Sequence, residues 1–136
     1  MVAIAVAPLV LKDVVLTLGT DSYEKHVNEV KFTPSASTIS WTGLGGNTVT
    51  DVATATWAVA LGYVQDWETV DSLSQYLLAN EGLSVEATFK PKSGSGPSFT
   101  ATLTITPGAI GGAVNAYATT SVTLGSTKPV LVPALP

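Results

Sequence analysis

The chain has 136 residues, which suits one domain spanning 1–136, and its net charge is −4. Apolar residues make up 46% and charged residues only 12%, about half the usual share, so we expect other protein copies to cover part of the surface. With no cysteine and no arginine among its six basic residues, the chain offers neither thiolate metal sites nor the guanidinium groups typical of nucleic-acid binding.

The N-terminal segment, residues 1–12, is apolar and carries no charge until Lys12. It is too short to span a membrane, which takes roughly 20 apolar residues. A signal peptide has its positive charge before the apolar stretch, whereas Lys12 follows it and Pro8 interrupts it. We therefore expect an extended N-terminal arm and no membrane partner.

Most of the remaining chain alternates between apolar and polar residues, the pattern of half-buried β-strands. The clearest case is FTATLTIT, residues 99–106, in which threonine occupies every second position. Such a face without charge is unusual for a strand exposed to bulk water. Its members are Thr100, Thr102, Thr104 and Thr106. Further strands are expected at 14–18, 27–33, 38–42, 53–63, 84–90 and 116–124.

Glycine-rich stretches separate these strands and indicate turns. The longest is TGLGGNTVTD, residues 42–51, which has no evident apolar anchor and is predicted to be a mobile loop. Its central residues are Gly43, Leu44, Gly45, Gly46 and Asn47. The tract SGSGPS contains Gly94-Ser95-Gly96, but no helix follows it as in a nucleophile elbow, so it is interpreted as a hairpin loop.

One segment has helical periodicity instead. Apolar residues recur at spacings of three and four between residues 70 and 81, which predicts one short helix with an apolar stripe. Asp71 or Ser72 can cap its start, Ser72 with Gln75 forms a potential capping box, and Gly82 ends it. The last segment, residues 127–136, contains three prolines and is predicted to be an extended C-terminal arm without a partner strand.

These elements predict a mainly β fold: a β-sandwich or partial barrel with one short flanking α-helix and two extended arms. The sequence gives little support for a catalytic or metal-binding site. Asp66, Glu68 and Asp71 cluster at the start of the helix, where acids are favoured by the free N–H groups, and no calcium-binding loop surrounds them. His26 is the only histidine, so it cannot form a multi-histidine metal site. We expect no cofactor, no metal and no enzymatic activity.

The stretch from Trp57 to Pro129 resembles the tail tube (major tail) proteins of long-tailed bacteriophages, especially those infecting actinobacteria. The residues that carry the resemblance are YVQDW at 63–67, NEG at 80–82, FKPK at 89–92, PGAIGG at 107–112 and KP at 128–129. The stretch from Trp57 to Pro129 covers a little over half of the chain, and the resemblance is weaker before residue 50.

The resemblance implies a structural virion protein. Tail tube proteins of that family form hexameric rings that stack into a hollow tube, through which DNA passes during ejection without being bound specifically. The implied partners are other copies of the chain and the tail terminator, tape measure and distal tail proteins. The implied location is the phage tail, with assembly in the host cytoplasm. The threonine face would then line the bore or a subunit junction, and residues 43–47 would contact the next ring.

Two other classes of protein fit the same pattern. A phage head-decoration protein is also a small β domain with arms, and an immunoglobulin-like adhesion or carbohydrate-binding module is a solitary one. The second class would carry exposed aromatic residues on one sheet, whereas Trp41, Trp57 and Trp67 are expected on or near apolar faces.

Overall fold

The computed structural model describes residues 2–92, 94 and 96–134. Met1, Ser95 and the last two residues of the C-terminal arm lie outside this range, as does Ser93. The element order is β1(Val15–Leu18), β2(Asp21–Ser22), β3(Val27–Ser35), β4(Thr38–Thr42), β5(Thr48–Val52), β6(Thr56–Val64), α1(Leu73–Ala79), β7(Ser84–Lys90), β8(Ser98–Thr104), β9(Thr119–Ser126) and β10(Val130–Val132). The predicted mainly β fold with one short helix is confirmed.

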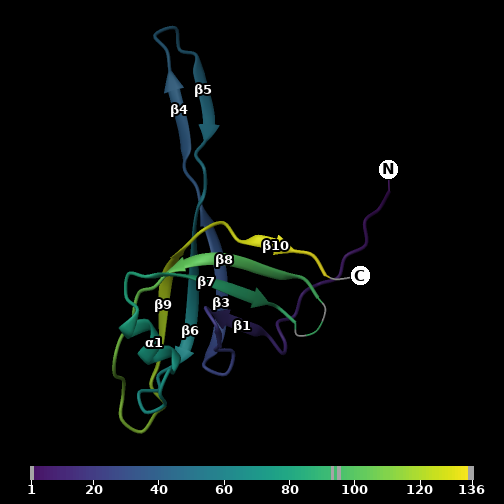
Figure 1. Cartoon of the computed structure of the whole chain (residues 1–136). Helices are drawn as coiled ribbons and strands as arrows, with labels where there is room; N and C mark the ends of the chain where they lie inside the picture. Colours follow the sequence, from purple (N-terminus) through teal and green to yellow (C-terminus); the bar gives the residue numbers. More distant parts are fainter. Residues whose placement is uncertain (1, 93, 95, 135–136) are drawn as a thin grey trace.

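The body of the molecule is one antiparallel sheet folded back on itself into a sandwich (Figure 1). Its strand order is β2-β1-β7-β8-β9-β6-β3, with β10 also paired to β8. Strands β8 and β9 pair through only two residues each, whereas β6 and β9 pair through eight. The β8–β9 junction is therefore the corner of the sandwich. β3 pairs only with β6, so the sheet does not close into a barrel in the part that the structure describes.

The core lies between the two halves of this sheet and follows from the alternation in the sequence. In β8 the residues between the threonines are buried, with Leu103 1% exposed. Strands β6 and β9 contribute in the same way, and helix α1 adds Leu73 and Leu77. The largest fully buried side chains are Leu16, Leu18, Tyr23, Val59, Leu61, Leu73, Leu77, Leu103, Ile105 and Leu124.

Helix α1 begins at Leu73, three residues later than the sequence predicts, and ends at Ala79. The reason is Asp71, whose φ of 64° is incompatible with a helix. Ser72 is the N-cap, and its side chain accepts a hydrogen bond from the backbone N–H of Gln75 at 3.4 Å. The Gln75 side chain does not complete a capping box, because its Nε2 donates to the carbonyl of Trp67 at 2.6 Å. The helix ends two residues before the predicted bound at 81, with Asn80 as its C-cap. Gly82, whose φ is 84°, lies in the turn that follows.

The predicted loop at 42–51 is wrong in its second half. Residues 48–52 form strand β5, which pairs antiparallel with β4 in a separate two-stranded sheet. Only residues 43–47 remain as the turn, in which the N–H of Gly43 donates to the carbonyl of Asn47 at 2.8 Å. The hairpin projects well away from the sandwich (Figure 1). The signal available for this strand was its content of β-branched residues, since four of the five residues at 48–52 are threonine or valine.

The two arms differ. Residues 2–12 form no strand and are exposed, as expected of an arm. The C-terminal segment was predicted to lack a partner strand, and this is wrong for Val130–Val132, which form β10 against Ser98, Phe99 and Thr100 of β8. Prolines on either side, at 129 and 133, confine this strand to three residues at an edge, where a missing N–H costs least.

Candidate assembly surfaces

The threonine face of β8 is outward-facing, as the alternation predicts. Thr102 and Thr104 are exposed and Thr100 is partly covered. Thr106 is also exposed but lies beyond the end of the strand. In the register with β7, Thr100, Thr102 and Thr104 pair with Thr88, Glu86 and Ser84. The two strands therefore present one hydroxyl surface with the Glu86 carboxylate at its centre, and Lys90 follows on the same face at the end of β7.

This hydroxyl surface is bordered by the C-terminal segment. The Thr127 side-chain oxygen accepts from the backbone N–H of Thr102 at 2.9 Å, and the N–H of Thr127 donates to the Thr102 carbonyl at 3.0 Å. Val130 lies opposite Thr100. A shallow hollow is lined by Glu86, Thr100, Ala101, Thr102, Thr127 and Val130.

The β4–β5 hairpin is the second candidate surface. Cross-strand pairing places Trp41 beside Val49 and Ile39 beside Asp51, so that three large apolar side chains share one face. All three are exposed, Trp41 by 65%. The opposite face carries hydroxyl groups, with the side-chain oxygens of Thr42 and Thr48 3.2 Å apart. A two-stranded hairpin alone is marginally stable in water, so an apolar face on such a hairpin indicates contact with another surface.

The turn of the hairpin is built from the residues singled out in the sequence. Gly46 has a φ of 82°, which favours glycine. A Cβ on Gly43 would lie 2.5 Å from the Asn47 side-chain oxygen and 3.0 Å from the Trp41 ring, so this glycine allows the ring to pack over the turn. Leu44 at the tip is fully exposed.

Trp41 lies on the apolar face of the hairpin, as the sequence predicts, but that face is exposed. Only Trp57 is partly buried, while Trp41 and Trp67 are exposed. They do not form an aromatic platform on one sheet, because Trp41 lies on the hairpin and Trp67 in the loop before α1. The tryptophans therefore do not form the cluster of exposed aromatic residues on one sheet that a carbohydrate-binding module would carry.

The acidic residues Asp66, Glu68 and Asp71 belong to the turn that precedes helix α1, and Asp66 stabilises this turn. The Asp66 carboxylate accepts the backbone N–H groups of Glu68 and Thr69, each at 3.1 Å. Hydrogen bonding with Thr69 lowers the pKa of Asp66, with a further contribution from Glu68. In the described part of the chain, no three His, Asp or Glu side chains are placed to hold a metal ion. Within the same part, no helix is long and apolar enough to cross a membrane.

His26 also has a structural environment. Its ring meets the Tyr23 ring edge-on, with 5.9 Å between centroids. Its backbone carbonyl accepts from the N–H of Val64 at 2.9 Å. Among the described residues, every buried side-chain nitrogen or oxygen has a hydrogen-bond partner.

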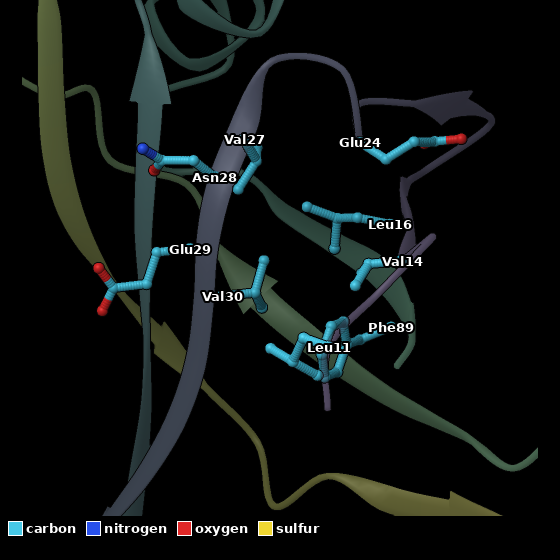
Figure 2. Close-up of a pocket in the computed structure, with 9 residues that line it drawn as sticks. All are labelled: Leu11, Val14, Leu16, Glu24, Val27, Asn28, Glu29, Val30 and Phe89. Atoms are coloured by element: carbon cyan, nitrogen blue, oxygen red, sulfur yellow. The ribbon is translucent and has the colours of Figure 1, made fainter. Parts of the chain in front are cut away.

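A third feature is an apolar groove along the open side of the sandwich, between the unpaired edge of β3 and strands β1 and β7 (Figure 2). Val27 and Val30 of β3 point toward Val14 and Leu16, whereas Glu29 points away. The groove continues toward the base of the hairpin as a second hollow of about 410 Å³. The residues lining that part are Leu9, Leu11, Val30, Lys31, Phe32, Trp57, Phe89, Phe99, Lys128 and Pro129.

No family model matches the chain, and no curated protein sequence matches it either. The fold is nevertheless similar to solved structures of contractile injection systems. A chain of the PVC sheath–tube complex of an extracellular contractile injection system in the extended state superposes with a TM-score of 0.65 at 13% identity, covering 93% of both chains.

Two further similar structures come from the ends of such tubes. A chain of the PVC sheath/tube terminator, also in the extended state, has a TM-score of 0.65 at 15% identity and covers 95% of this chain and 99% of its own. The tube-terminating cap of the anti-feeding prophage has the same TM-score and identity and covers 97% and 96%. The shared fold therefore spans nearly the whole chain, including the residues before 50.

Proposed function

We propose that the chain is a non-enzymatic structural subunit of a phage-type tail tube, built as one domain of residues 1–136 with arms at 1–12 and 127–136. Copies of it form hexameric rings that stack into a hollow tube, the conduit for DNA ejection. Its other partners are the tail terminator, tape measure and distal tail proteins. It assembles in the host cytoplasm and remains in the virion tail.

The observation that carries this proposal is the exposed apolar face of the β4–β5 hairpin. Its side chains Ile39, Trp41 and Val49 have no covering partner within the described part of the chain. A soluble domain with few charges does not retain such a projecting apolar ribbon unless it is covered in its working state. The similarity to tube and tube-terminator components supports another subunit as the cover.

The hydroxyl surface of β7 and β8 suits a bore or a subunit junction. A conduit must let DNA pass without holding it, and affinity for DNA comes mainly from Lys and Arg on phosphates. Thr100, Thr102 and Thr104 contribute none of these cations, and the nearest charge on this surface is the carboxylate of Glu86. We assign the turn residues 43–47 to the contact with the adjacent ring, because they form the outer end of the hairpin.

A tube terminator is the second candidate, favoured by the two terminator structures of equal TM-score. The two roles differ in how many rings assemble. A tube subunit stacks on copies of itself without limit, whereas a terminator forms a single ring that closes the end.

Negative-stain electron microscopy of the purified chain, with light scattering against concentration, tests both roles. We expect rings that stack into tubes. Rings that never stack favour the terminator. A monomer of 13.9 kDa at high concentration under every salt condition contradicts both, and trimers point instead to a head-decoration protein.

A further inference from the structure

The N-terminal arm has the sequence pattern of a β-strand, but it pairs with no other strand in the part of the chain that the structure describes. From residue 2 to residue 7 it reads VAIAVA, a strict alternation of large and small apolar residues. Val2, Ile4 and Val6 are 86%, 93% and 84% exposed. In an extended strand these three side chains share one face, and the three alanines share the other. Burying the face with Val2, Ile4 and Val6 would therefore remove more apolar surface from water than burying the alanine face.

The groove beside β3 has the complementary features of a strand acceptor. Among the described residues β3 is paired on one side only, which leaves a row of backbone groups free on the other. The apolar side chains along this edge are Val14, Leu16, Val27 and Val30, and farther on Phe32. Glu24, Asn28 and Glu29 supply the polar part of the lining. An added strand would gain main-chain hydrogen bonds from β3 and apolar contacts from the groove, the arrangement known as β-augmentation.

The dimensions of the arm and the groove agree. At roughly 3.3 Å per residue, the six residues 2–7 cover about 20 Å, and so do residues 27–32 of β3. Pro8 has no backbone N–H and comes immediately after the alternating stretch, so it would end the added strand without interrupting it.

The occupant is a second copy. Leu9 and Leu11 already line the groove of their own chain, while residues 2–7 lead away from the body (Figure 1). The arm thus leaves one groove and is free to enter the next. The C-terminal arm is less suitable, because its β10 residues are already paired with β8.

We propose that residues 2–7 of one copy add as a strand to the free edge of β3 in a neighbouring copy, with Val2, Ile4 and Val6 in the apolar groove. This inference rests on the proposed function, since it specifies the contact between neighbouring subunits. Repeated around a ring, it covers the unpaired β3 edge of every subunit.

Two neighbouring substitutions in the full-length chain test the assignment. Ile4→Asp places a carboxylate in the apolar groove, and Ala5→Asp places the same carboxylate on the opposite face of the strand. Because an unpaired buried charge is costly, we expect Ile4→Asp to raise the concentration needed for assembly more than about tenfold and Ala5→Asp to change it much less. Both variants should melt like the unaltered monomer, because residues 4 and 5 are exposed there. Equal effects of the two variants, or no effect of either, would overturn the inference.

A cross-linking experiment separates this contact from the tube itself. The chain has no cysteine, so one population carries Ile4→Cys and another Val30→Cys, and the two are mixed under oxidised glutathione. A disulfide between the two populations supports the inference even if no tube forms. Tubes that assemble normally without this disulfide leave the proposed function intact and overturn the inference. A chain carrying both cysteines that cross-links internally at high dilution also overturns it, because the arm then enters its own groove.

Discussion

Thr102→Lys distinguishes the roles of the outward face of β8 in folding and in assembly. The lysine would replace an exposed side chain opposite Glu86. The two hydrogen bonds that tie residue 102 to Thr127 come from its backbone and persist after the change. A surface substitution of this kind alters the free energy of unfolding by less than about 1 kcal/mol, and the cross-strand pair with Glu86 offsets part of any loss.

The matched control is the next residue. Leu103 is 1% exposed and points into the core, so Leu103→Ala should lower the free energy of unfolding by about 2–5 kcal/mol. Urea denaturation of the monomers measures both changes, and an unchanged m-value shows that the extent of unfolding is the same. If Thr102→Lys destabilised the monomer as strongly as Leu103→Ala, residue 102 would not be facing outward.

Assembly of Thr102→Lys then tells a bore from a junction. At a subunit junction the repeated lysines lose their hydration, a cost that the pair with Glu86 does not repay, and assembly is blocked. In a bore they permit assembly, but passing DNA meets a ring of cations that bind its phosphates, and delivery slows. Electron microscopy reports the first outcome and a DNA-ejection assay the second. Normal assembly together with normal DNA delivery would refute the assignment of this face to either place.

Three further measurements test other parts of the structure. Deleting residues 2–7 should impair assembly and leave the melting temperature of the monomer nearly unchanged. Deleting residues 129–136 should impair assembly and also lower the melting temperature of the monomer, because it removes β10. If the first deletion unfolded the monomer, the N-terminal arm would be part of the core. The turn at residues 43–47 should be cut by proteases faster in the monomer than in the assembled tube, and equal protection would argue against an inter-ring contact. Burial and the nearby carboxylate of Asp21 raise the pKa of Tyr23 to about 12 from its ordinary 10.0. The unfolded chain therefore loses this proton at a lower pH than the folded chain, so the stabilisation that is complete below pH 10 should be lost between pH 10 and 12. Tyr23→Phe should weaken that loss in alkaline denaturation, and an unchanged pH profile would count against the burial of this hydroxyl.

Local sequence determined the strands whose two faces differ in chemistry. Residues 84–90 were predicted as a strand with the bounds of β7, and the threonine alternation of residues 100–104 separates the inner and outer faces of β8. Ser72 and Gly82 likewise delimited the helix within a few residues. These features depend on contacts between near neighbours, on side-chain alternation and on backbone φ, all of which are encoded within short segments.

Only the tertiary structure decided which segments pair. Residues 48–52 and 130–132 are short and rich in β-branched or apolar residues, but whether such segments form strands depends on a partner: β4 for the first and β8 for the second. The exposure of Trp41 followed from the same pairing, because β5 extends the ribbon beyond the body. The apolar groove also arises only in the fold, since it brings residues near 14, 30 and 89 together. β-sheet pairing joins residues distant in sequence, and its energy belongs to the pair of strands rather than to either one alone.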